Sequence, residues 1–167
     1  MIEGPLPPGL RARIGAVRLV LALDGPDAPL PAAMPDAVLL TARTGRDVAA
    51  LGARLAVHEA ERGWPDGQVR ILAEIREPLG VLEARSFVGA SPRLDGLGLD
   101  EAALTVALAA EAGEAIRQAR AFVRLAAAAA GVTAFATLSP DEIAGGRRDG
   151  YGLLITRDPT VLSSVAL

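Results

Sequence analysis

Short runs of apolar residues alternate along this chain with longer segments in which apolar residues recur at every third or fourth position. The runs are typical of buried strands in a parallel sheet, and the longer segments are typical of helices that pack one face on such a sheet. Strands are expected at 16–23, 37–41, 69–75, 93–99, 132–136 and 150–155. Helices are expected to begin near residues 44, 80, 101, 139 and 158, and the helix from 101 to 130 has a possible break near Gly113.

This alternation of strands and helices predicts an α/β fold in which helices cover a parallel sheet. A complete TIM barrel has eight such units and takes about 250 residues. The 167 residues therefore predict a truncated or incomplete TIM (β/α) barrel with about six parallel strands. Residues 1–15 are rich in proline and are expected to form a leader, and residues 16–167 are expected to form a single barrel-like domain.

The composition excludes several classes of protein. Hydrophobic residues make up 51% of the chain, yet no apolar run is long enough to cross a membrane. The chain has no cysteine and its amino terminus lacks the order of a signal peptide, so a cytoplasmic protein without disulfides is expected. The net charge is −3 and the arginines are dispersed, which predicts no binding of nucleic acid. Lysine is absent, so Schiff-base chemistry is excluded.

The helix expected after residue 44 carries clear boundary signals. Thr44 and Asp47 form a capping pair at its start, and Gly63 is typical of its end. The only histidine, His58, falls within this helix, away from the strand ends, which indicates a surface or half-buried role. Trp64 is expected to anchor the end of the helix by packing on the outside of the barrel.

Charged residues gather where the third and fourth expected strands end. Glu74, Arg76 and Glu77 lie at the end of the third, and Asp100 and Glu101 follow the fourth. The carboxyl ends of parallel strands are where α/β proteins keep their sites. Because side chains alternate along a strand, Glu74 and Arg76 share a face and could pair. Asp100 and Glu101 also suit the start of the next helix, as an N-cap and as an acid near its positive end.

Two long segments follow a recognisable order of motifs. They read HEAERGWPDGQVRILAEIREPLGVLEARSFVGASPRLDGLGLDEAAL and ARAFVRLAAAAAGVTAF. In this order and spacing, from about residue 38 to 155, the chain resembles the citrate lyase β-subunit and HpcH/HpaI aldolase family. Members of that family are metal-dependent carbon–carbon lyases on a TIM barrel. The resemblance implies a divergent lyase that acts on a keto-acid or acyl-CoA type substrate with Mg²⁺ or Mn²⁺, and it matches the chain to the last six strands of the family's barrel.

The resemblance also assigns residues to substrate binding and catalysis. Arg18 matches the strand arginine that holds the substrate carboxylate, and Gly98 falls at the glycine of the family's glycine-x-x-aspartate motif and is assigned to substrate binding. Arg18 and Arg76 are the implied catalytic residues. The family's proline-lysine pair falls on Thr41-Ala42, so both of its members are replaced here.

The metal positions implied by the resemblance are altered. The metal-binding glutamate of the family falls on Arg76, and the metal-binding aspartate falls on Glu101. One interpretation is that Glu77, or alternatively Glu74 or Asp100, joins Glu101 in holding the metal. A second is that the charges form a structural ion pair in a disused site. A third is that Arg76 binds an anion directly.

Two functions follow from these alternatives. The first is the metal-dependent lyase. The second is a catalytically inactive relative that serves as a binding or interaction module. Because an arc of six parallel strands leaves sheet edges that proteins usually cover, a homo-oligomer or a subunit of a larger complex is expected.

Overall fold

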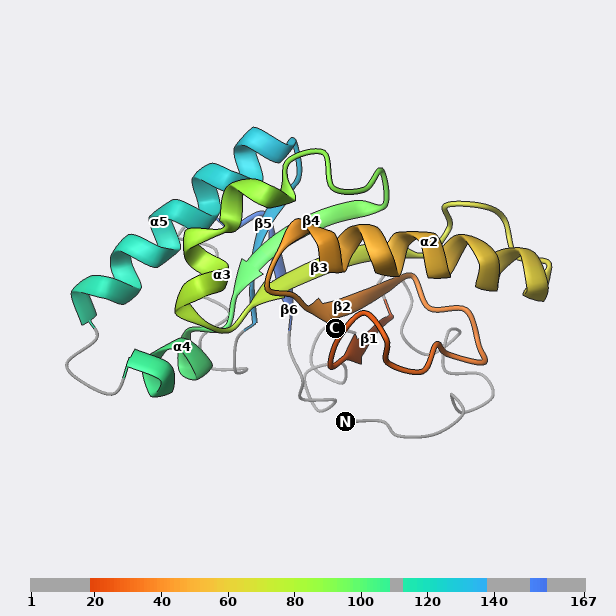
Figure 1. The fold of residues 1–167 in the computed structure, drawn as a ribbon, viewed down its shortest axis with the longest axis horizontal. Helices are drawn as coiled ribbons and strands as arrows, with labels where there is room; N and C mark the ends of the chain where they lie inside the picture. Colours follow the sequence, from red (N-terminus) through yellow and green to blue (C-terminus); the bar gives the residue numbers. More distant parts are fainter. Residues whose placement is uncertain (1–18, 109–112, 138–150, 156–167) are drawn as a thin grey trace, which may run out of the picture.

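Six parallel strands form one sheet in the computed structural model, and their order in the sheet follows the chain (Figure 1). The structure describes residues 19–108, 113–137 and 151–155. The strands are β1 (Val20–Leu23), β2 (Ala37–Thr41), β3 (Arg70–Ile75), β4 (Leu94–Leu99), β5 (Thr133–Thr137) and β6 (Leu153–Ile155). A parallel sheet in sequence order is the arrangement of an arc of a TIM barrel, which confirms the predicted fold class.

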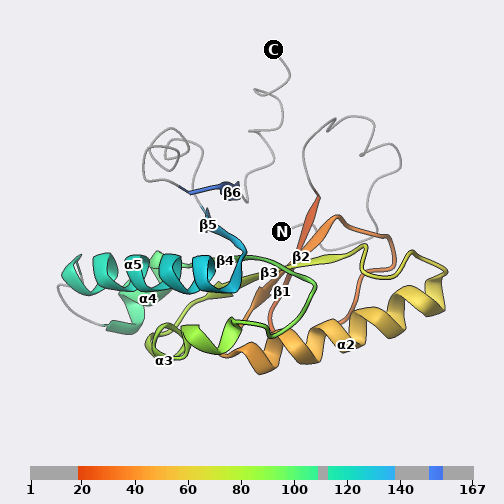
Figure 2. The same ribbon diagram turned by 90° about the horizontal axis from the view of Figure 1, so that it is seen from above.

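The helices lie on one face of the sheet (Figure 2). They are α2 (Gly45–Arg62), α3 (Pro78–Leu82), the 3₁₀ helix η1 (Ala84–Phe87), α4 (Glu101–Leu108) and α5 (Gly113–Ala130). Helices that return the chain to the next parallel strand on one side are what repeated right-handed β/α units produce. Among the described helices, none is long and apolar enough to cross a membrane.

Alternate residues of the strands divide the core into two clusters. The larger cluster lies between the sheet and the helices and includes Ile71, Ala73 and Ile75 of β3 with Leu51 and Leu55 of α2. The smaller lies on the opposite face, which we call the inner face, and is built on Ala37, Leu39, Leu72 and Phe135. Side chains of β3 that share a face with Leu72 therefore belong to the inner face.

The boundaries of α2 follow the predicted signals. Asp47 Oδ2 accepts hydrogen bonds from the backbone N–H of Thr44 at 3.0 Å and of Arg43 at 2.7 Å, which satisfies donors at the helix start. Gly63 ends the helix with φ of 65°, in the left-handed region that glycine adopts without strain. Trp64 then packs against the larger cluster, as predicted.

Some boundaries differ from those expected. The helix expected at 80–88 is two short pieces, α3 and η1, and α3 begins earlier because Pro78 fits the first turn of a helix. The helix expected at 101–130 comprises α4 and α5, with residues 109–112 outside the described part. The leader and the helices expected from 139 and 158 also lie outside it, as do residues 16–18 of the first expected strand.

Candidate functional site

Arg76 and Asp100 contact each other at the carboxyl ends of β3 and β4. Arg76 Nε donates to Asp100 Oδ2 over 3.0 Å, and Asp100 Oδ1 accepts from the backbone N–H of Ala103 at 2.9 Å. The second bond caps α4 and confirms the predicted N-cap. The expected pair of Arg76 with Glu74 is wrong. A backbone hydrogen bond of 2.9 Å from Asp100 to Ile75 holds the aspartate beside Arg76 instead.

Glu74 lies deeper on the inner face and is only 1% exposed. Its Oε1 accepts a hydrogen bond of 2.6 Å from the Thr137 hydroxyl on β5. β4 runs between β3 and β5, and it places Gly98 beside Glu74 in register. Because Gly98 has no side chain, the carboxylate of Glu74 can reach across β4 to Thr137. The buried carboxylate therefore joins strands that do not pair with each other.

Phe135 fills the interior below Glu74. A Cβ added to Gly98 would lie 2.4 Å from the Phe135 ring, and one added to Gly96 would lie 2.8 Å from Leu72 and 3.0 Å from Phe135. The two glycines of β4 thus make room for this aromatic ring. The assignment of Gly98 to substrate binding stays a prediction, and the geometry gives Gly98 a packing role.

Glu77 follows β3 and occupies the N-cap position of α3, without a capping side-chain hydrogen bond. Its Oε1 lies 2.7 Å from Nε of Arg43, an ion pair whose angles fall outside those of a hydrogen bond. The side chain of Arg43 is 74% exposed and that of Glu77 is 37% exposed. Glu77 therefore joins the end of β3 to the residues that follow β2.

Glu101 forms a two-pronged ion pair with Arg120 of α5. Both carboxylate oxygens accept, one from Arg120 Nε and one from Nη2, each over 2.8 Å. This fork-to-fork geometry is the most directional arrangement available to an arginine and a carboxylate. Glu101 therefore fastens the start of α4 to α5.

A divalent cation at this edge would take these carboxylates as its ligands. Over the described ranges, no group of three or more histidine, aspartate or glutamate side chains is placed to hold a metal ion. Glu77, Asp100 and Glu101 each contact an arginine, and Glu74 accepts a hydroxyl. Mg²⁺ and Mn²⁺ need several oxygen ligands turned toward a common centre. To hold such an ion, each carboxylate of this edge would have to leave the arginine or hydroxyl that it contacts.

Comparison with known proteins identifies the family of this chain. The profile described as HpcH/HpaI aldolase/citrate lyase matches residues 32–149. The chain belongs to this family. The search of curated protein sequences gave no match. This match confirms the family resemblance inferred from the sequence motifs.

Several solved structures share the fold of this chain. A citrate lyase from Burkholderia xenovorans LB400 is 16% identical with a TM-score of 0.65, and the match covers 80% of this chain and 48% of that one. RipC from Yersinia pestis is 20% identical with a TM-score of 0.62, covering 93% and 79% of the two chains. A malate synthase from Haloferax volcanii is 16% identical with a TM-score of 0.58, covering 75% and 41%. The chain thus spans about half the length of the first of these structures.

Arg18, the substrate-carboxylate residue implied by the family resemblance, lies outside the described residues. Its catalytic and substrate-binding roles stay predictions. Of the site residues that the resemblance implies, the described part of the chain contains Glu74, Arg76, Glu77, Gly98, Asp100 and Glu101. The resemblance implies a metal-binding glutamate at the position of Arg76, so this arginine is the main departure from the implied site.

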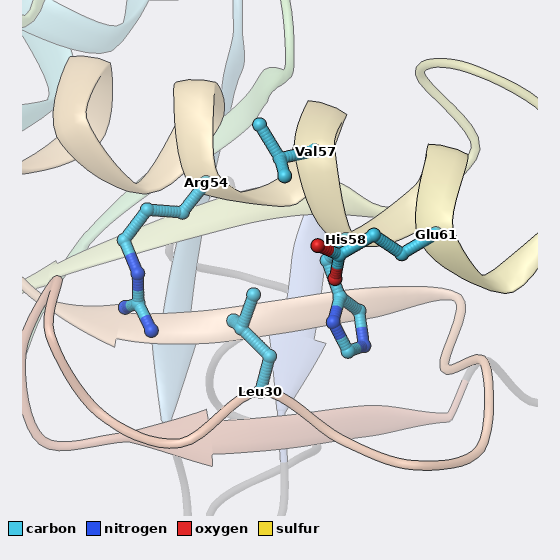
Figure 3. Close-up of a pocket in the computed structure, with 5 residues that line it drawn as sticks. All are labelled: Leu30, Arg54, Val57, His58 and Glu61. Carbon is cyan, nitrogen blue, oxygen red and sulfur yellow. The ribbon is translucent and has the colours of Figure 1, made fainter.

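A shallow groove of about 390 Å³ lies away from this edge, between α2 and the proline-rich connector that joins β1 to β2 (Figure 3). Its lining residues are Leu30, Arg54, Val57, His58 and Glu61. Arg54 donates to the carbonyl oxygen of Ala28 at 3.1 Å, and His58 Nε2 lies 2.9 Å from that of Pro31. These side chains fasten the connector to α2. His58 is half-buried, as predicted.

A second charged cluster lies at the amino end of the sheet, where Arg93 and Glu59 are buried and Asp66 is exposed. Arg93 lies 2.7 Å from Glu59 and 2.6 Å from Asp66. Glu59 also accepts from the backbone N–H of Gly67 at 2.9 Å and of Val69 at 2.8 Å. Burial by itself would raise the pKa of Glu59, but the hydrogen bond from Arg93 and the two backbone hydrogen bonds outweigh it, so the pKa is lowered.

Four residues of the edge escaped prediction from the sequence: Arg43, Arg120, Phe135 and Thr137. Arg43 and Thr137 had a usable signal, because each lies at or just after the end of a strand. Arg120 had none, since its partner Glu101 belongs to a different helix. The sequence around Phe135 predicted a strand, but it did not indicate that glycines on β4 would accommodate the ring of Phe135.

Proposed function

We propose that this chain is a non-catalytic member of the HpcH/HpaI aldolase/citrate lyase family that serves as a binding or interaction module. One observation carries this proposal. Arg76, which the family resemblance puts at the metal-binding glutamate, lies at the carboxyl edge in an ion pair with Asp100. A guanidinium remains protonated at any ordinary pH. It puts a fixed positive charge where the lyase mechanism needs a divalent cation.

The neighbouring acids support the same proposal. Glu101, at the implied metal-binding aspartate, has both oxygens engaged by Arg120, and Glu77 lies against Arg43. A cation at these positions would have to draw both carboxylates away from arginines that they already contact. Each separation would break an ion pair that the fold already contains.

Turnover measurements test the proposal against the metal-dependent lyase. In the lyase, Glu77 and Glu101 would hold Mg²⁺ and Arg18 would hold the substrate carboxylate. Oxaloacetate and 4-hydroxy-2-keto acids should be incubated with the full chain and Mg²⁺ or Mn²⁺, and pyruvate release measured. We expect no release above that given by metal alone. Release that disappears in Glu101→Ala would refute the proposal and establish the lyase.

The proposal includes assembly into a homo-oligomer or a larger complex. A chain that has lost catalysis still contributes by presenting its fold to other subunits or to a ligand. The mass in solution, measured by light scattering after size exclusion, should exceed the 17.1 kDa of one chain. A monomer at all concentrations would rule out self-assembly.

A further inference from the structure

One side of α2 carries a row of exposed residues, which we call the outer row. It consists of Arg46, Ala50, Ala53, Val57 and Glu61, all of them exposed. Residues spaced by three or four positions lie on one side of a helix. The buried residues of α2 pack toward the sheet, so the outer row points away from it. It lies at the margin of the helical layer (Figure 2).

The middle of the outer row is apolar and adjoins a hollow. Val57 is 60% exposed, and it lines the groove between α2 and the connector together with Leu30 (Figure 3). The hydrogen bonds of Arg54 and His58 to carbonyl oxygens of the connector hold the two sides of this groove together. Alanine at the remaining positions lets a second helix approach closely. Covering this surface would remove apolar area from water.

The two ends of the outer row carry opposite charges. Arg46 lies in the first turn of α2 and Glu61 in the last. Within the described ranges, neither side chain has an ion pair or a hydrogen bond. The helix dipole favours the reverse arrangement, with an acid at the start and a base at the end. The stability of α2 therefore does not account for this pair of charges, whereas a partner of matching charge would use both.

We propose that α2 binds α2 of a second copy of this chain in antiparallel orientation and forms a two-fold interface. The axis passes between the positions of Ala53 and Arg54. Arg46 lies seven residues before the first of these and Glu61 seven residues after the second, so each arginine lies opposite the partner's Glu61. A self-complementary face of this kind is what a two-fold dimer requires. The inference rests on the proposed function, because it assigns a surface to the assembly included there.

The same pattern decides the orientation and the strength of the dimer. A parallel pair would bring Arg46 beside Arg46 and Glu61 beside Glu61, which like charges disfavour. In the antiparallel pair, Ala50 faces Val57 of the partner subunit, and the start of each helix covers the groove of the other. A stable interface buries about 1,600 Å², of which one pair of helices supplies only a part. We therefore expect dissociation in the micromolar range, with dilute protein mostly monomeric.

Sedimentation velocity of the full chain, over a range of micromolar concentrations, tests this inference. Arg46→Glu and Glu61→Arg each put like charges at both ends of the interface and should weaken the dimer at least about tenfold. The double variant restores opposite charges and should restore the dimer. Both changes agree with the helix dipole, so α2 should stay folded. Arg85→Glu, at an exposed arginine of η1, is the matched control and should leave the dissociation constant unchanged.

A second measurement does not depend on charge. The chain has no cysteine, so Ala53→Cys introduces a single thiol beside the two-fold axis, facing its counterpart. Oxidation with copper phenanthroline should join the two copies through a disulfide, which forms only where the two Cα atoms are about 4–7 Å apart. Ala121→Cys, at an exposed alanine of α5, is the matched control and should remain largely unlinked.

The outcomes separate this inference from the proposed function. Unchanged dissociation in both single reversals, a double variant as weak as the single ones, or equal cross-linking of the two cysteine variants would overturn the inference. A dimer formed through another surface gives those results and leaves the proposed function standing. A monomer at all concentrations would overturn the inference together with self-assembly. Pyruvate release from oxaloacetate that requires Glu101 would refute the proposed function even where α2 pairs as expected.

Discussion

The Nε of Arg76 lies 3.0 Å from Oδ2 of Asp100, and the other oxygen of the same carboxylate caps α4 through Ala103. One aspartate thus joins the end of β3 to the start of α4. In the implied family mechanism, acids at this edge hold a metal. In this chain these acids form ion pairs with arginines, and the ion pairs join neighbouring strands and helices.

Asp100→Ala should destabilise the protein more than Arg76→Gln. The alanine removes the N-cap of α4 as well as the ion pair, which costs about 1–2 kcal/mol of unfolding free energy. The ion pair alone is partly exposed and contributes about 1 kcal/mol or less. Asp100→Asn keeps an oxygen for the N–H of Ala103 and should fall between the two. Urea unfolding measures all three, and equal losses in the alanine and asparagine variants would show that the cap contributes nothing.

Gly98→Ala should destabilise by about 1–3 kcal/mol, because its Cβ would overlap the Phe135 ring. Combining it with Phe135→Leu should cost less than the sum of the two single changes, since the smaller side chain relieves the overlap. Gly113→Ala is the matched control, because among the described residues a Cβ there would meet only Arg117, at 4.0 Å. Additive losses in the double variant would contradict the packing of Phe135 on Gly98.

Thr137→Val should expose the structural role of Glu74. The valine keeps the shape of threonine but removes the hydroxyl that donates to the buried carboxylate, which costs about 1–3 kcal/mol. Thr137→Ser keeps the hydroxyl and should lose much less. Thermal and urea unfolding provide the comparison. If serine and valine destabilise equally, the hydrogen bond to Glu74 contributes little and the loss comes from packing.

The stability of the protein should depend on pH through Glu59. The folded state lowers the pKa of Glu59 from its ordinary value of 4.5, so this carboxylate contributes stability above that value. The contribution is lost as the pH falls below 4.5 toward the folded pKa. Glu59→Gln should lower the unfolding free energy at pH 7 by about 1–3 kcal/mol, since it removes the buried charge that pairs with Arg93 and leaves only the exposed Asp66 as an ion-pair partner.

The same variant should flatten the pH dependence. Urea unfolding between pH 6 and pH 3 should show a smaller decline in Glu59→Gln than in the native chain. Glu61→Gln, an exposed acid of the same helix, should retain the native decline. A native and a Glu59→Gln profile that run parallel would show that Glu59 does not titrate differently in the folded state.

The strands could be read from the sequence because strands buried on both faces are continuous apolar runs. β2 is apolar up to Thr41, and its observed bounds are those expected. The start of α2 was equally predictable from the sequence, because Thr44 and Asp47 interact within a single turn. Local rules of this kind need no knowledge of the neighbouring strand.

The contacts of the candidate site could not be read in the same way. The partner of Arg76 depends on the register between β3 and β4, which puts Asp100, 24 positions away, beside it. Alternation along β3 predicted that Glu74 and Arg76 share a face and could pair, yet Arg76 pairs with Asp100. The reach of Glu74 to Thr137 depends on a glycine in a third strand.

The affinity for Mn²⁺ tests most directly whether this edge still holds a metal. The electron paramagnetic resonance signal of free Mn²⁺ should be followed as the full chain is titrated into it. We expect the signal to persist, with no binding in the micromolar range, whereas Arg76→Glu should reduce it by restoring a carboxylate. Micromolar binding by the native chain that is lost when Glu77 and Glu101 are changed to glutamine would contradict the loss of the metal site.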